Sequence, residues 1–194
     1  MAHFPTTTTL GEALRTFYAA HNLGEEGGIN KRWAKLKVGK FYIPFPNTQS
    51  RKKALLFHDV HHIVTGYDSD WKGEVSISAW EIASGCREYY AAWVLDLWGM
   101  AVGLVLYPKA VFQSFVRGKR TLNLYGNPVS HDQLVSMQIG VVQRKLLLEQ
   151  TGFQKATSGE IVSFLFWTTV SVLSFVVPFV LPYVVIGYSL HHYF

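Results

Sequence analysis

The sequence lacks paired cysteines and any apolar segment near its N-terminus. Cys86 is the only cysteine, so no intramolecular disulfide can form and an oxidising compartment receives no support. The first residues, MAHFPTTTTLGEALRTF, contain no apolar run of the kind that a secretory signal needs. They also hold too few arginines to resemble a mitochondrial transit peptide. We therefore expect neither type of targeting segment here.

Charge is also missing from one long stretch, because residues 161–194 contain no Lys, Arg, Asp or Glu. The charges lie before it, and they are divided: residues 1–60 are mainly basic, whereas residues 58–96 are mainly acidic. This division suits a protein that rests on anionic lipid and holds a cation. No nucleic-acid-binding motif accompanies the basic residues, so we expect no nucleic-acid partner. The hydrophobic content of 49% excludes a disordered chain.

Helix-capping signals and apolar spacing predict an all-α, mostly helical fold. Thr9 and Glu12 have capping-box spacing, and Asn47 and Thr48 can cap a second helix that Gly66 ends. The expected elements are helices at 10–21, 49–64, 74–90, 91–107 and 130–152, an extended segment at 35–45, and a loop that holds the basic cluster 117–120.

An uncharged run at 161–190 follows the capping-box pair Thr157 and Glu160. It is long enough, at helical rise, to cross a bilayer core of about 30 Å. Because Pro178 and Pro182 interrupt it, we expect one kinked transmembrane helix or a re-entrant hairpin that turns near Pro178. A buried core helix is the alternative, but a small domain has little surface with which to cover such a run.

We therefore predict one helical metal-binding domain at 1–155 and an apolar membrane segment at 156–194. The cations Arg144, Lys145 and Lys155 precede the apolar run, which favours a globular part on the cytoplasmic or matrix side. The run at 91–107 is better explained as an interfacial or buried helix, because Asp96 would be costly in lipid unless it were paired.

The most informative motif is Leu56-Phe57-His58-Asp59-Val60-His61-His62. His58 and His62 are four residues apart, so on a helix both imidazoles project from one face. Glu74 comes at the first turn of the next expected helix, which a short loop allows to fold back. The spacing predicts a divalent-metal site of His58, Asp59, His62 and Glu74 for Zn²⁺, or alternatively Fe²⁺ or Mn²⁺.

Three other residues near this motif have open roles. Asp59 can be the fourth ligand or act on substrate as a catalytic base. Glu81 can be the hydrogen-bond partner of a ligand histidine or an exposed residue, and we favour the first interpretation. Glu88 is expected to be solvated. The competing explanation of the whole motif is a polar helix surface that happens to carry three histidines.

Written out, the pattern His-Asp-x-x-His-x11-Glu resembles the signature of the coenzyme Q (ubiquinone) biosynthesis protein four family. The match is complete at His58, Asp59, His62 and Glu74, and Thr65-Gly66-Tyr67 is also similar. The resemblance extends over about 10–152. The apolar tail departs from the family, whose members are usually peripheral membrane proteins.

The resemblance implies a metal ion, with zinc first, and a hydrophobic groove for a polyprenyl chain. It implies removal of the C1 carboxylate from a polyprenylated benzoate ring with hydroxylation, and organisation of other biosynthetic proteins. Expected partners are membrane lipid, an isoprenoid quinone precursor, other membrane or biosynthetic proteins, and a second copy of the chain. The expected location is the mitochondrial inner membrane or the bacterial cytoplasmic membrane. In this hypothesis Arg117, Lys119 or Arg120 holds an anionic head group.

Three rival functions use the same residues. The first is a non-catalytic lipid-binding scaffold or accessory subunit of a membrane complex, in which a metal only ties two helices together. The second is a phosphohydrolase that uses His58 and Asp59 with His21 and Asp132, which leaves His62 and Glu74 unexplained. The third is a membrane di-iron oxygenase, which would need several histidine boxes that the other histidines do not form.

Overall fold

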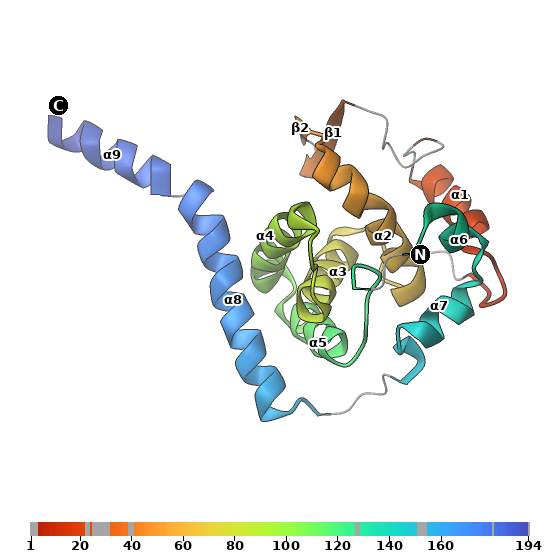
Figure 1. Ribbon diagram of the computed structural model, residues 1–194. Coiled ribbons are helices and arrows are strands. Elements are labelled where there is room, and N and C mark those ends of the chain that lie inside the picture. The colour runs from red at the N-terminus through yellow and green to blue at the C-terminus, as the bar shows by residue number, and fades with distance from the viewer. Residues whose placement is uncertain are drawn as a thin grey trace.

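The computed structural model describes residues 4–21, 24, 32–38, 41–126, 129–150, 155–179 and 181–193. Its fold is all-α, as the capping signals predict, with one short antiparallel hairpin near the N-terminal end (Figure 1). The elements in chain order are α1 (Leu10–Ala20), β1 (Trp33–Val38), β2 (Phe41–Pro46), α2 (Gln49–Thr65), α3 (Trp71–Ser84), α4 (Tyr90–Leu106), α5 (Pro108–Lys119), α6 (His131–Ser136), α7 (Ile139–Lys145), the 3₁₀ turn η1 (Leu148–Gln150), α8 (Ser158–Phe179) and α9 (Leu181–Tyr193).

The first two helices begin and end where the sequence predicts. At α1 the Thr9 hydroxyl accepts from the Glu12 backbone N–H, and the Glu12 carboxylate accepts in return from the Thr9 N–H. At α2 Thr48 accepts from the Arg51 N–H. Gly66 ends α2 with a φ of 78°, a left-handed conformation that glycine adopts without strain. The end of α2 is therefore fixed close to His58 and His62.

Helix α3 differs from prediction, because it ends at Ser84 instead of continuing to residue 90. Gly85 and Arg87 both have positive φ, 92° and 48°, which stops the helix and starts a turn. Cys86 is buried and lies in the segment between α3 and α4. Glu88 is exposed on the same turn, which confirms its predicted solvation.

Two other predicted elements also differ from the structure. The basic cluster 117–120 is not a loop, since Arg117 and Lys119 lie in the last turn of α5 and Arg120 caps it. The helix expected at 130–152 is broken into α6, α7 and η1, while residues 151 and 152 lie outside the described residues. The break follows from tertiary pairing, because the Leu10 N–H donates to the Met137 carbonyl at 2.8 Å.

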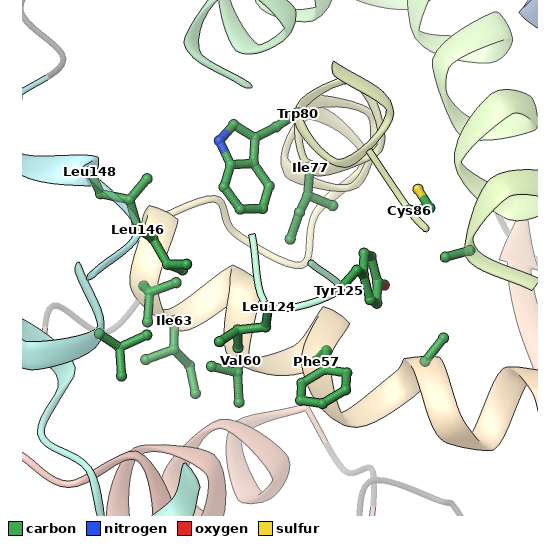
Figure 2. Packing of buried hydrophobic residues seen from close by; sticks show 14 of the residues in the cluster. Phe57, Val60, Ile63, Ile77, Trp80, Cys86, Leu124, Tyr125, Leu146 and Leu148 are labelled. Atoms are coloured by element: carbon green, nitrogen blue, oxygen red, sulfur yellow. The ribbon is translucent and has the colours of Figure 1, made fainter. Parts of the chain in front are cut away.

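The core lies between α2, α3 and the segment that follows α5 (Figure 2). Trp80 on α3 is fully buried, and its indole N–H donates to the Thr121 hydroxyl at 2.8 Å. Gly118 lets α5 approach α3 closely, since a Cβ there would lie only 2.5 Å from the Trp80 carbonyl oxygen. This close packing holds α3, and with it Glu74 and Glu81, in a fixed position.

The C-terminal apolar run forms two helices that meet near Pro178. The capping box before α8 is present, with Thr157 and Glu160 exchanging hydrogen bonds. Helix α8 is long and apolar enough to cross a membrane, by its length and composition. Figure 1 shows α9 turning away from the end of α8 and not folding back along it, which agrees with a kink rather than a hairpin.

Candidate metal centre

Three of the predicted ligand side chains meet between α2 and α3. The Nε2 atoms of His58 and His62 are 3.2 Å apart, because the helix places both rings on one face. Glu74, in the first turn of α3, lies 3.5 Å from His62 Nε2 and 3.7 Å from His58 Nε2 through its two carboxylate oxygens. The two rings stand nearly perpendicular, at 87°. Two nitrogens and a carboxylate therefore converge on one small volume.

The other nitrogen of each histidine has an acceptor that fixes the tautomer. His62 Nδ1 lies 3.0 Å from the backbone carbonyl of Tyr67. His58 Nδ1 lies 3.2 Å from both carboxylate oxygens of Glu81. Because carbonyl and carboxylate oxygens only accept, both Nδ1 atoms carry a proton, and the two Nε2 atoms face the shared space. Metal-binding histidines are oriented in this way in proteins.

The spacing of these donor atoms fits a tetrahedral divalent ion. With metal–ligand distances of about 2.0–2.1 Å, two donors of a tetrahedral site lie about 3.3 Å apart. The observed separations of 3.2, 3.5 and 3.7 Å are close to that value. Two facing Nε2 atoms beside a carboxylate are stabilised when a cation, either a proton or a metal ion, lies among them. The residues present therefore fit a metal ion.

The burial of the three ligands leaves one side of the centre open. The side chain of His62 is 2% exposed, that of His58 is 22% exposed, and that of Glu74 is 44% exposed. A water or substrate atom can therefore approach from the side of Glu74. Three protein ligands with an accessible fourth position are typical of catalytic metal sites rather than structural ones.

The charges around the centre favour a cation. Burial lowers the pKa of His58, but the charge of Glu81 and hydrogen bonds with Glu74 and Glu81 outweigh burial and raise this pKa well above its usual value. Desolvation likewise acts to raise the pKa of Glu74, yet the charge of His62 and hydrogen bonds from both histidines hold it well below its usual value. The centre thus stabilises positive charge among its carboxylates.

Asp59, the fourth predicted ligand, does not join this cluster. Its side chain is buried, and Oδ2 accepts a hydrogen bond from the Tyr18 hydroxyl of α1 at 3.0 Å. Two groups of described residues could hold a metal ion, His58, His62 and Glu74, and His58, Glu81 and Asp96, and neither includes Asp59. Burial raises the pKa of Asp59 to about 6, although the charges of His58 and His62 act in the opposite direction. The role of Asp59 as a base remains a prediction.

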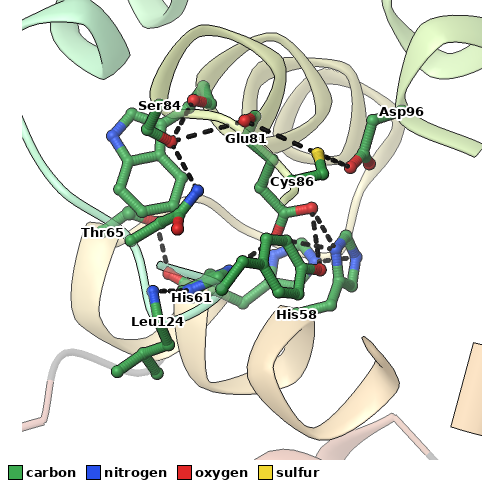
Figure 3. A network of polar contacts seen from close by, with 12 residues as sticks. His58, His61, Thr65, Glu81, Ser84, Cys86, Asp96 and Leu124 are labelled. Atoms are coloured by element: carbon green, nitrogen blue, oxygen red, sulfur yellow. Dashed lines mark hydrogen bonds and ion pairs between the residues drawn. The ribbon is translucent and has the colours of Figure 1, made fainter. Parts of the chain in front are cut away.

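Glu81 is the centre of a buried network behind His58 (Figure 3). It is fully buried and accepts from His58, from His61 Nδ1 at 2.6 Å and from the Tyr125 hydroxyl at 3.2 Å. Burial acts to raise the Glu81 pKa, but the charge of His58 and the hydrogen bonds from His58 and His61 hold it well below its usual value. Glu81 is thus a charged hydrogen-bond partner of His58, one of the predicted ligands, and is not exposed.

Three members of this network were missed by sequence reasoning. His61 is fully buried, and its Nε2 accepts from the Leu124 backbone N–H at 3.0 Å, so His61 is a structural residue and faces away from the metal centre. Asp96 on α4 accepts from the Cys86 thiol at 3.6 Å and lies within 4.8 Å of Glu81, and burial together with the charge of Glu81 raises the Asp96 pKa well above its usual value. Tyr125 comes from the segment after α5. Only Asp96 left a signal, as the single charge in an apolar run.

Arg117 supports the turn that orients His62. Its guanidinium donates to the Thr65 carbonyl at 2.9 Å and lies over the Tyr67 ring, 5.3 Å from the centroid. Tyr67 in turn supplies the carbonyl that accepts from His62. Arg120 is paired with Glu160 at 2.6 Å. The structure therefore gives both arginines intramolecular partners, and a head-group role for this cluster remains a prediction.

The Arg117→Met variant is expected to bind metal about tenfold more weakly than the wild type, the low end of the range for loss of a histidine's hydrogen-bond partner, because Arg117 acts on His62 through Tyr67. Met keeps the length of the side chain but cannot hold the Thr65 carbonyl. Titration with zinc against a fluorescent chelator measures the change. Lys119→Met, on the same helix but exposed, serves as the control and should bind metal as the wild type does. Equal affinities for the two variants would contradict this role.

A surface hollow of about 380 Å³ lies near the start of α2. It is lined by Ser50, Lys53, Glu88 and Tyr89 and includes none of the predicted metal ligands. The charged side chains of Lys53 and Glu88 in its wall do not suit a polyprenyl chain, so the expected hydrophobic groove remains a prediction.

Comparison with known proteins gives no independent assignment. No protein-family model matches the chain, no curated protein matches it, and no solved structure matches it. The similarity to the coenzyme Q biosynthesis protein four family therefore rests on the motif His-Asp-x-x-His-x11-Glu and its neighbours alone.

Proposed function

We propose that this chain is a membrane-associated metal-binding protein of prenylquinone biosynthesis. Its reaction is metal-assisted decarboxylation, with hydroxylation, at C1 of a polyprenylated benzoate ring. One observation carries the proposal: His58 and His62 have their Nδ1 atoms committed to Glu81 and Tyr67, which leaves the two Nε2 atoms facing the Glu74 carboxylate. The family resemblance of the same residues supplies the pathway.

The proposed ion is zinc, with iron or manganese as alternatives, held by His58, His62 and Glu74. When bound, it supplies a Lewis acid that polarises a ring oxygen of the substrate. Glu81 keeps the His58 ring in its ligand orientation through the hydrogen bond at 3.2 Å. Glu74 is the most exposed of the three ligands and lies on the side from which a substrate can enter.

Asp59 is the proposed base of the reaction. Its pKa of about 6 leaves it mostly ionised at neutral pH, and its Oδ2 already accepts a hydrogen bond from Tyr18. Loss of the C1 carboxylate as carbon dioxide leaves an electron pair on the ring. Hydroxylation at the same carbon removes two electrons, so dioxygen must be a co-reactant; one of its oxygen atoms enters the ring hydroxyl, and with water the other leaves as hydrogen peroxide.

The location proposed for this reaction is a membrane, either the mitochondrial inner membrane or the bacterial cytoplasmic membrane, with the globular part on the matrix or cytoplasmic side. The exposed apolar side chains of α8, among them Val162, Leu165 and Phe166, support this location. An isoprenoid substrate partitions into the same phase. Neighbouring biosynthetic proteins are further proposed partners.

Release of labelled carbon dioxide tests the activity. Purified protein in phosphatidylcholine vesicles receives zinc, dioxygen and a polyprenylated benzoate that carries an isotopic label in its carboxylate. We expect the wild type to release label and Glu74→Gln to release none. His131→Ala is the matched control, because His131 is an exposed histidine on α6, away from the centre.

A wild-type protein that binds metal but releases no label under these conditions would contradict the enzymatic proposal. It would favour the alternative, a lipid-binding scaffold or accessory subunit whose metal fastens α2 to α3. The extensive apolar surface of α8 and α9 is the observation that favours this alternative. Mass spectrometry of lipids extracted with the protein separates the two: a prenylated quinone precursor supports the pathway, and phospholipid alone supports the scaffold.

A further inference from the structure

Helix α8 is docked against the domain along most of its length. Near its start Glu160 pairs with Arg120 at 2.6 Å. Further along, Phe164 packs on Phe115 and Trp167 stacks on Trp93, with ring centroids 5.3 and 5.1 Å apart. The covered stretch continues past Ser171, which is fully buried.

A hydrogen bond fastens the far end of the docked stretch. Pro178 has no N–H, so the carbonyl of Ser174, four residues earlier, loses its normal helical donor. The indole N–H of Trp98 on α4 donates to this carbonyl at 3.1 Å. A neighbouring helix thereby satisfies a backbone group that water would otherwise hydrate, as occurs where proline interrupts helices in lipid.

The two sides of α8 differ in burial with helical periodicity. The side chains that face the domain are partly or fully buried, including Phe164, Trp167, Thr168 and Ser171. The outward side chains are exposed and apolar except for Thr169: Ile161, Val162, Leu165, Phe166, Val172, Leu173, Val176 and Val177. A surface helix in water carries polar residues on its outward face. Helix α8 is therefore built to face lipid on one side and protein on the other.

Helix α4 continues this apolar surface. Its outward residues Val94, Leu95, Val105 and Leu106 are all exposed, and Val105 reaches 82%. The only charge of α4, Asp96, points inward to Cys86 and Glu81. Because α4 lies beside α8, the outward faces of the two helices can enter the same lipid layer.

The docking limits how α8 can sit in a bilayer. The stretch that the domain covers, from Glu160 to Ser174, is about 21 Å long, most of the thickness of a hydrocarbon core of about 30 Å. If α8 stood across the bilayer in this arrangement, α5 would stand at the same depth. Two exposed polar side chains of α5, Gln113 and Lys109, would then lie in hydrocarbon. Gln113 follows Phe112, whose ring contacts that of Phe164.

We propose that α8 lies in the plane of the membrane instead of crossing it, and that the outward faces of α8 and α4 rest in one leaflet. The partner of this surface is the acyl-chain region of that leaflet. This inference rests on the membrane location proposed above and adds the orientation. It places the metal centre one helix away from lipid, since Asp96 of α4 lies within 4.8 Å of His58 and Glu81.

Depth-dependent fluorescence quenching tests the orientation. Single cysteines replace Val162, Thr169 and Val177 along α8, Val105 on α4 and Gln133 on α6, and each is labelled with an environment-sensitive fluorophore. The protein is reconstituted in phosphatidylcholine–phosphatidylglycerol vesicles that contain lipids spin-labelled at a shallow or a deep acyl position. The unsubstituted protein gives the background, because the native Cys86 is buried. Bound metal confirms that each variant is folded.

For the three α8 probes we expect the same ratio of quenching by the shallow spin label to quenching by the deep one. The Val105 probe should show a comparable ratio, and the Gln133 probe should remain unquenched. A Thr169 probe that lies deep while the Val162 and Val177 probes lie shallow would overturn the in-plane orientation and leave the membrane location standing. Quenching along α8 without quenching at Val105 would overturn the role of α4. No quenching at any position would overturn the membrane location itself.

Discussion

Metal binding is expected to fall by more than about 100-fold in the His62→Ala variant. Loss of an outer partner alone costs 10–100-fold in metal affinity, and His62 is a direct ligand in the proposed centre. Its Nε2 atom faces both His58 and Glu74. These two residues are the only other members of the group, so the His62→Ala variant would keep two ligands instead of three. Inductively coupled plasma mass spectrometry of the purified protein, with a chelator titration, measures the loss.

Two further variants make this prediction decisive. His62 also stacks on Phe17, with ring centroids 5.8 Å apart, so its removal can disturb packing. Glu74→Gln changes the most exposed ligand without changing its size, and it should also lose metal. His131→Ala should retain it. Metal retained at the wild-type level by both His62→Ala and Glu74→Gln would show that the ion binds elsewhere.

The free energy of unfolding is expected to fall by about 3–5 kcal/mol in the Glu81→Ala variant, the usual cost of breaking a buried charged pair. Glu81 is fully buried, and its removal leaves His58, His61 and Tyr125 without their shared acceptor. Denaturant titration of the detergent-solubilised protein, followed by near-UV circular dichroism, measures the change.

Glu88→Ala is the matched control for this loss, because Glu88 is exposed on the turn after α3. A surface change of this kind alters stability by no more than about 0.5 kcal/mol. Glu81→Gln keeps an acceptor oxygen, so its free energy of unfolding should lie between those of Glu81→Ala and Glu88→Ala. If Glu81→Ala proved as stable as Glu88→Ala, the buried network would not be a source of stability.

The local part of this fold follows from the sequence. The caps of α1 and α2 are decided by residues within one turn, and so is the pairing of His58 with His62 on one helix face. The loop before α3 is short enough for Glu74 to return to these histidines. These features depend on neighbours in the chain, which is why spacing alone could indicate three of the four proposed ligands.

The remaining features depend on contacts between distant segments. Asp59 turns to the Tyr18 hydroxyl, which comes from a helix 41 residues earlier. His61 and Glu81 are joined to Tyr125 and Asp96 by packing that no helical pattern indicates. The break between α6 and α7 arises where Met137 pairs with Leu10. The early end of α3 is the exception, because Gly85 is a local signal for the end of a helix and the predicted helix nevertheless continued past it.

The most direct test of the metal centre is X-ray absorption spectroscopy of the wild-type protein that carries one equivalent of zinc. If His58, His62 and Glu74 hold the zinc ion, the spectrum should show two imidazole nitrogens at about 2.0–2.1 Å, oxygen ligands at a similar distance and no sulfur ligand. A sulfur ligand at about 2.3 Å would contradict the centre formed by His58, His62 and Glu74, and so would a ligand shell without imidazole. Cys86, the single cysteine of the chain, is the residue that could supply a thiolate.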